Sequence, residues 1–166
     1  MKAVSNTTPL RYLIAIEQEH LLGQLFEKLF VPAAVHAELT DAKTPETVRR
    51  RVLSLPPWFE VRTVPEAPAT DFPVVLHRGE REAILLAEAL RADVLLIDEQ
   101  IGRTIALSRN LPLSGTLGVL EQADRIGLVS DFPQVLQQLK ASGFFITPTL
   151  EQQLLERHRQ RRHRRS

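Results

Sequence analysis

The sequence predicts an α/β fold in which helices cover both faces of a short, parallel central sheet. Helical segments alternate with short apolar runs along the chain, which is the pattern of βαβ units. One of these runs, Val94–Ile97, is continuously apolar, as expected for a strand that is buried on both faces. The 166 residues favour a single domain with one sizeable core.

The first forty residues are expected to contain one strand and three helices. A short strand over Lys2–Ser5 is broken by the string NTTP, whose proline opens a helix over about Pro9–Ile16. Apolar residues at i, i+3 and i+4 spacing predict a second helix over about Glu19–Leu29. A third helix covers about Pro32–Leu39, and Glu38 lies beside its buried face.

The middle of the chain alternates between helix and strand. A helix over Pro45–Pro56 is ended by a pair of prolines, and Phe59–Val64 has the alternation of a strand. The stretch Pro65–Pro73 carries three prolines and is expected to be a loop. A strongly periodic helix over Gly79–Leu90 then leads into the buried strand at Val94–Ile97.

The last third is expected to be mostly helical. A helix carries the apolar residues of Ile101–Leu107, and Leu111–Leu113 is a candidate short strand. Ser114–Ile126 begins with small residues and continues as a helix. Asp131 caps a further helix, and the glycine at position 143 ends it. A short apolar segment then leads into a final helix that begins at Pro148.

Composition restricts the kinds of site and environment that fit this chain. The absence of cysteine excludes disulfides and thiolate metal sites and fits a reducing cytoplasm. No apolar run approaches the roughly 18 residues of a membrane span, and the N-terminus lacks a signal-peptide pattern. We therefore expect a cytoplasmic protein without a membrane partner.

The net charge of +1 hides an uneven distribution. Six Arg and no acidic residues lie from residue 157 onward, whereas residues 1–156 carry 15 Lys+Arg and 20 Asp+Glu, a charge of −5. We expect a globular domain over 1–150 and a C-terminal helix with an Arg-rich tail over 151–166. This tail is either a solvated helix end or a phosphate-binding arm. The arm interpretation assigns nucleic-acid binding to Arg157, Arg159, Arg161 and Arg162.

Polar residues at element ends indicate a site at one edge of the sheet. Asn6 follows the first strand and Asp98 follows the central one, so both are expected at the carboxyl edge, where ligands bind in parallel α/β sheets. Glu38 and Glu80 are further candidates. Converging carboxylates repel each other by about 4 kcal/mol per pair at ~4 Å and an effective dielectric of ~20. Mg²⁺ or Mn²⁺ relieves that repulsion and can activate water for phosphodiester hydrolysis.

Each candidate also has a purely structural interpretation. Asp98 can be a helix N-cap, and Glu80 can be a first-turn acid that interacts favourably with the helix dipole. Glu38 can belong to a solvated helix face, and Asn6 is a common turn residue. The choice between these interpretations depends on the context in which the four residues occur.

That context is supplied by five strings in order: VSNTTPL, VPAAVHAEL, GEREAILLA, VLLIDEQIGR and SGTLGVL. They span Val4 to about Leu120, and the later string SGFFIT also fits. With them the chain resembles the PIN-domain nucleases of compact bacterial or archaeal type. It is most similar to a subgroup that shares an SNT start, a GE-x-EAI helix, an LLID strand and a GTLGVL segment. The resemblance covers nearly all of the chain except the Arg-rich tail.

The resemblance implies a three-layer α/β/α PIN-like fold with a cluster of metal-binding acids at one end of the sheet. It assigns catalysis to Glu38, Glu80 and Asp98, which also bind the metal together with Asn6. Asn6 stands where the family usually has Asp, which removes one charge from the site. The interval of 18 residues between positions 80 and 98 matches the helix-plus-strand spacing of the family.

That spacing favours Glu80 over Glu82 as a ligand, and we assign Glu82 and Glu99 to solvated faces. Hydroxyl groups that hydrogen-bond the site are expected from Thr7, Thr8 and Thr116. Arg103 is expected either to contact phosphate or to be an exposed helix residue.

The resemblance further implies a Mg²⁺ or Mn²⁺ cofactor, an RNA substrate, a small antitoxin protein as partner and a homodimer as the working unit.

Two other functions remain open from the sequence. One is a non-catalytic module that binds nucleic acid or an antitoxin, in which Asn6 marks a degenerate metal site. The other is a receiver-like domain that accepts a phosphoryl group on Asp98, although the paired acids of its first loop are missing. Dinucleotide-binding, P-loop, serine-hydrolase and HExxH motifs are absent.

Overall fold

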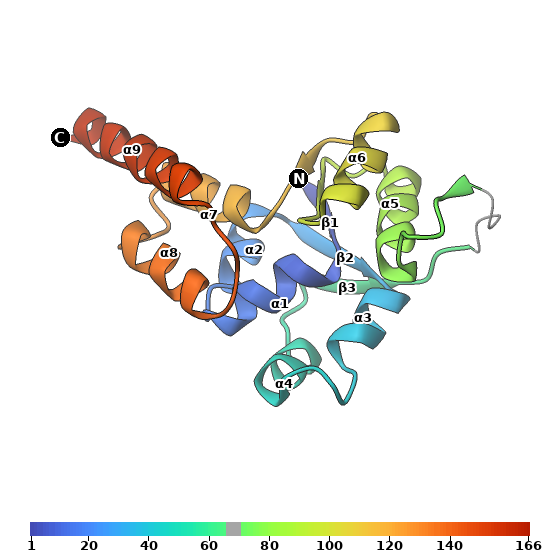
Figure 1. Cartoon of the computed structure of the whole chain (residues 1–166). Coiled ribbons are helices and arrows are strands. Elements are labelled where there is room, and N and C mark those ends of the chain that lie inside the picture. Colours follow the sequence, from blue (N-terminus) through green and yellow to red (C-terminus); the bar gives the residue numbers. More distant parts are fainter. Residues whose placement is uncertain (66–70) are drawn as a thin grey trace.

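The computed structural model describes residues 1–65 and 71–166. Within them, a five-stranded sheet has the order β3-β2-β1-β4-β5, and every neighbouring pair of strands is parallel. Helices flank both faces, so the predicted three-layer α/β/α architecture is confirmed (Figure 1). The strands are β1 (Lys2–Ser5), β2 (Lys28–Pro32), β3 (Phe59–Arg62), β4 (Val94–Leu96) and β5 (Leu113–Ser114).

Two groups of helices cover the two faces of the sheet. Successive residues of a strand point to opposite faces, so neighbouring residues contact different groups of helices. On one face Val4 and Leu95 pack against α5 and α6. On the other face Ala3 and Leu96 belong to a larger core with α1, α2, α7 and α8. The helices are α1 (Thr7–Ala15), α2 (His20–Leu25), α3 (Ala33–Leu39), α4 (Glu46–Leu53), α5 (Arg78–Leu90), α6 (Gln100–Ser108), α7 (Thr116–Arg125), α8 (Phe132–Ala141) and α9 (Pro148–Arg165).

The helix predicted over Glu19–Leu29 is wrong in its second half. Helix α2 ends at Leu25, and the chain becomes extended at Phe26, with φ −127° and ψ 138°. The following strand, β2, is hydrogen-bonded between β1 and β3 and is buried on both faces. A short apolar run of this kind fits a helix and a buried strand equally well, so its periodicity did not separate them.

Strand β5 begins at Leu113 and not at Leu111, where the candidate strand was expected to begin. Helix α6 carries the predicted apolar residues, but Ile101 and Leu107 are 50% and 61% exposed, and the helix packs through Gly102, Ile105 and Ala106. The loop predicted over Pro65–Pro73 lies partly outside the described residues.

Helix α9 is docked on α7 by charged side chains. Asp124 of α7 is buried and accepts hydrogen bonds from Arg161 at 2.5 Å, and its carboxylate lies 2.9 Å from Nδ1 of His158. The expected boundary at residue 150 falls inside α9, which begins at Pro148 after the side-chain cap of Thr147. No helix within residues 1–65 and 71–166 has the length and apolar character of a membrane span.

Candidate active site

The site lies at the carboxyl edge of the two central strands. Asn6 immediately follows β1, and its backbone N–H donates to the carbonyl of Leu96 at the end of β4, at 2.9 Å. Asp98 lies two residues after Leu96, the last residue of β4. Because β1 and β4 are parallel neighbours, the two polar residues are brought to the same edge.

The N-terminus of α7 holds Asp98, and Asp98 does not cap α6, the helix that follows it in the chain. Its Oδ1 accepts from the backbone N–H of Thr116 at 2.9 Å, and its Oδ2 accepts from the Thr116 hydroxyl at 2.6 Å. The N-cap of α6 is instead Glu99. Burial raises the pKa of Asp98, and the two Thr116 hydrogen bonds partly oppose that change. Thr116 therefore fixes the orientation of a buried carboxylate.

Arg103 is partly buried and is not the exposed helix residue that one of its two interpretations predicted. Its Nη1 donates to the carbonyls of Ile97 at 2.7 Å and Ser114 at 3.2 Å, so it ties together the ends of β4 and β5. The guanidinium charge beside Asp98 lowers the pKa of that carboxyl. The residue is partly buried, and the nitrogen that binds these carbonyls is already engaged within the fold.

Glu80 is buried at the first turn of α5, with 7% of its surface exposed. Its Oε2 accepts from the backbone N–H of His77 at 3.2 Å, which closes the N-terminus of the helix. Burial raises the pKa of Glu80, and the nearby charges of Glu99 and Glu38 raise it further. Glu80 thus has the structural role of a first-turn acid. It also lies near two further acidic side chains, which that structural role does not require.

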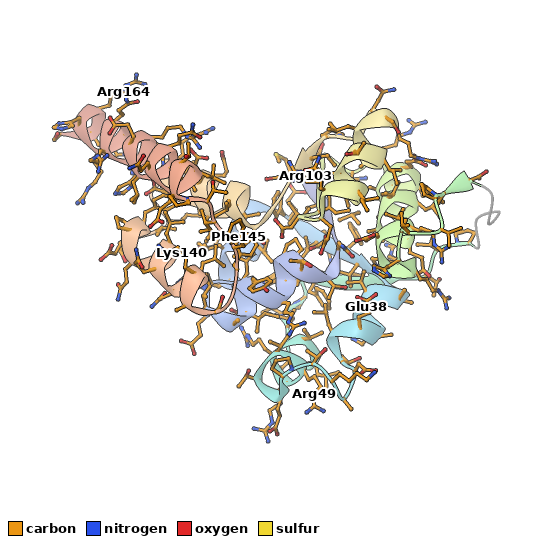
Figure 2. All side chains as sticks on the ribbon, in the orientation of Figure 1. Glu38, Arg49, Arg103, Lys140, Phe145 and Arg164 are labelled. Atoms are coloured by element: carbon orange, nitrogen blue, oxygen red, sulfur yellow. The ribbon has the colours of Figure 1, made fainter. Side chains whose placement is uncertain are left out.

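Glu38 enters the site from α3, on the opposite side of β1 from Asp98. It is exposed, and its Oε2 accepts from the Thr7 hydroxyl at 2.6 Å. A Cβ at Gly79 would lie 2.7 Å from Glu38 Oε1, so the absence of a side chain there admits this carboxylate beside α5. Figure 2 shows Glu38 on α3 and Arg103 on α6, which places contributions to the site on widely spaced elements.

Glu99 belongs to the site, and its assignment to a solvated face was wrong. Its Oε2 accepts from Asn6 Nδ2 at 3.1 Å, and its Oε1 accepts from the hydroxyl of Thr8. Glu82 is not on a solvated face either: its side chain is 14% exposed and accepts from Arg78 at 2.7 Å. Sequence reasoning missed Glu99 because an acid after the strand-end Asp was treated as an ordinary helix residue.

A cavity of about 480 Å³ joins most of these residues. Asn6, Thr7, Thr8, Arg11, Glu38, His77, Arg78, Glu80 and Glu99 form its lining. Asp98 is not part of this lining because its carboxylate is directed to Thr116, but the charge of Glu99 raises the pKa of both Asp98 and Glu80. The three carboxylates are thus electrostatically coupled across the cavity and its wall.

The donor chemistry of this cluster fits a hard cation. Mg²⁺ and Mn²⁺ take carboxylate, amide-carbonyl and water oxygens, which are the groups that Asn6 and the neighbouring acids supply. Among the described residues, however, no three His, Asp or Glu side chains stand close enough together to form a ready-made metal site. Hydrogen bonds to Thr7, Thr8 and Thr116 hold the acids apart. A bound cation would therefore have to bring these carboxylates closer together.

The arginines of α9 are mostly engaged within the protein. Arg157 and Arg161 bind Glu121 of α7, at 2.5 Å and 3.2 Å. Arg159 pairs with an acid one turn earlier on its own helix. Of the four arginines expected to bind nucleic acid, only the guanidinium of Arg162 has no partner among the described parts of the chain. Intramolecular ion pairs therefore hold most of the charge that the arm interpretation requires.

The protein is an α/β protein with a parallel sheet between two layers of helices and acidic residues at the carboxyl edge of that sheet. The model of the PIN-domain family matches residues 2–160, and this chain therefore belongs to the PIN-domain family. Proteins of this family are generally nucleases, act on nucleic acid and typically use divalent metals. A search among curated proteins finds no match.

Proposed function

We propose that the protein is a Mg²⁺- or Mn²⁺-dependent endoribonuclease that hydrolyses RNA phosphodiesters. The observation that carries this proposal is the meeting of Asn6, Glu80 and Glu99 in one cavity beside Asp98. These groups come from the ends of β1 and β4 and from the starts of α5 and α6, so the fold itself gathers them. Membership of the PIN-domain family supports the same chemistry.

The metal would be held by Glu38, Glu80 and Asp98, with Asn6 as a neutral oxygen ligand. Glu99 joins this set because it is hydrogen-bonded to Asn6 and coupled electrostatically to the other acids. When bound, a divalent cation polarises a phosphoryl oxygen and lowers the pKa of water. Burial first, and nearby acidic charges in addition, raise the pKa of Glu80 and Asp98, and a bound cation would offset part of that effect.

The chain's own residues set the protonation and orientation of the acids. Burial raises the pKa of Glu80, which makes this carboxyl a better proton acceptor than an exposed one. Thr116 fixes Asp98 through two hydrogen bonds, so this carboxylate is oriented before substrate arrives. Thr8 and Asn6 hold Glu99 in the same way.

A second candidate function is a non-catalytic module that binds nucleic acid or an antitoxin. The specific observation in its favour is that Asn6 uses its amide N–H to hold Glu99, while the described acids form no ready-made metal site. An uncharged Asn binds metal less strongly than Asp, so a second metal is disfavoured.

The receiver-like alternative does not fit the sheet. A receiver domain has the strand order 2-1-3-4-5, whereas this sheet has the order 3-2-1-4-5. We therefore set that function aside.

We further propose that the protein acts as the toxin of a toxin–antitoxin pair, with a small antitoxin as partner and a homodimer as the working unit. This part rests on the resemblance of the five sequence strings to that group of PIN-domain proteins. Size-exclusion chromatography with light scattering tests the dimer: a mass near twice 18.8 kDa is expected, and a monomer at all concentrations contradicts it.

Cleavage of RNA tests the enzymatic proposal. Wild type and Asp98→Asn are each incubated with a mixed RNA pool in Mn²⁺, in Mg²⁺ and in EDTA. We expect cleavage by the wild type with either metal, none in EDTA, and a loss of at least a hundredfold for Asp98→Asn, the scale on which losing a catalytic group acts. A folded wild type that cleaves under no condition favours the binding module.

A further inference from the structure

Arg11 is a cation on the rim of the acidic cavity that the proposed reaction does not use. It is exposed on α1 and forms part of the cavity lining together with Asn6, Thr8 and Glu99. No hydrogen bond, ion pair or ring contact of its side chain is present within residues 1–65 and 71–166. A guanidinium beside several carboxylates that pairs with none of them is available to an anionic ligand.

Helical spacing sets where this cation lies relative to the acids. Arg11 is four residues after Thr7 and three after Thr8, so all three share one face of α1. Thr7 and Thr8 bind Glu38 and Glu99 respectively. Arg11 therefore lies about one helical turn, or ~5.4 Å along the helix axis, beyond the residues that anchor the carboxylates.

An exposed aromatic ring lies on the segment that packs against the residue after Arg11. Tyr12 follows Arg11 and packs edge-on against Phe144, with ring centroids 5.1 Å apart. The next residue, Phe145, is 82% exposed. Figure 2 shows Phe145 on the segment between α8 and α9, where that segment passes beside α1. An aromatic ring left this exposed offers a flat surface for stacking.

We propose that Arg11 and Phe145 form a binding track for single-stranded RNA, in which Arg11 holds a phosphate next to the cleaved one and Phe145 stacks a base. This inference rests on the proposed endoribonuclease function and adds two residues outside the acidic cluster that would bind its substrate. Cationic and aromatic side chains in alternation are the means by which proteins bind single strands without sequence preference. Bases in a duplex are already stacked on each other and cannot use the Phe145 ring in this way.

Binding without cleavage tests the track separately from the enzyme. A labelled single-stranded RNA 12-mer and the matching duplex are titrated in EDTA by fluorescence anisotropy, and gels confirm that the RNA stays intact. The variants are Arg11→Gln, Phe145→Ala and, as a matched control, Arg91→Gln. Arg91 is also exposed and unpaired among the described residues, but it lies at the C-terminal end of α5, away from the acids at its start.

We expect Arg11→Gln to weaken single-strand binding about tenfold, the effect of losing one charged hydrogen bond. The slope of log K against log salt should fall by about 0.7, which corresponds to one phosphate contact on a single strand. Phe145→Ala should weaken binding about fivefold or more on the single strand, with no matching loss on the duplex. Arg91→Gln should leave both values at those of the wild type.

If Arg11→Gln and Arg91→Gln weaken RNA binding equally, the phosphate contact of Arg11 is overturned, because any exposed cation would then have the same effect on affinity. Unchanged single-strand affinity of Phe145→Ala, or an equal loss on the duplex, would overturn the stacking contact. Circular dichroism and melting curves confirm that each variant is folded. If RNA binding depends on Arg11 but the protein cleaves RNA under no condition, the binding track is supported and the proposed nuclease function is contradicted.

Discussion

Replacing Gly115 by alanine tests how Asp98 is positioned. Gly115 has φ −145° and ψ −169°, an extended conformation that alanine also adopts, so the backbone itself should not resist the change. The added Cβ, however, would lie 2.5 Å from Asp98 Oδ1, and also 3.3 Å from Arg103 Nη1. Ordinary contacts of a Cβ begin at 3.4 Å, so the carboxylate must move by about 0.9 Å.

The energetic cost follows from what that oxygen already does. Asp98 Oδ1 accepts from the backbone N–H of Thr116 at 2.9 Å, and weakening such a charged hydrogen bond costs about 1.5–3 kcal/mol. For a chain of this length, about 2 kcal/mol corresponds to a decrease in melting temperature of roughly 4–8 °C. A displacement near 1 Å in a catalytic group should also reduce cleavage by about a hundredfold.

Thermal unfolding and RNA cleavage are measured for Gly115→Ala and for Gly118→Ala, which lies on the same helix. The Cβ of Gly118→Ala would meet only the side chain of Ser114, whose hydroxyl can rotate away, and alanine favours a helix interior by about 1 kcal/mol. This control should therefore melt at or above the wild-type temperature and stay active. A Gly115→Ala protein indistinguishable from the control would refute the proposed position of Asp98.

Three further predictions concern the acids and the last helix. Burial, followed by neighbouring acidic charges, raises the pKa of Glu80 above its usual 4.5, so the metal-free fold loses stability as pH rises from 4.5 through the raised value. Glu80→Gln should therefore raise the metal-free melting temperature at pH 7 and flatten its rise on acidification toward pH 4.5. Parallel pH dependence of wild type and variant would contradict this. Arg161→Met should cost about 3 kcal/mol in denaturant unfolding because it removes a partner of buried Asp124, whereas exposed Arg164→Met should change stability by less than about 0.5 kcal/mol. Glu99→Gln should reduce metal-dependent cleavage by about tenfold or more. Cleavage equal to that of the wild type would show that the charge of Glu99 is not needed for the reaction.

The sequence was sufficient to predict the layers and the edge at which the site lies. Alternating helices and apolar runs gave the parallel sheet, and the positions of Asn6 and Asp98 after strands placed both at the carboxyl edge. Strand β2 was missed because a fully buried strand and a buried helix share the same run of apolar residues.

Side-chain partners were less accessible to sequence reasoning. The contact of Glu99 with Thr8 joins residues 91 apart in the sequence, and no local pattern reports it. In the same way, the sequence predicted an Arg-rich tail, whereas the pairing of Arg161 with Asp124 docks the last helix on α7. Both contacts depend on how distant elements pack against each other in the folded protein, which periodicity does not encode.

Direct measurement of metal binding tests the central claim that the coupled acids hold a divalent cation. Isothermal titration calorimetry with Mn²⁺ is carried out on metal-free wild type, Glu80→Gln and Asp98→Asn, with the Arg91→Gln protein as control. We predict saturable binding near one ion per chain for the wild type and control, with about tenfold or greater loss of affinity in both acid variants. Absence of binding to a folded wild type, or equal binding by all four proteins, would contradict the account.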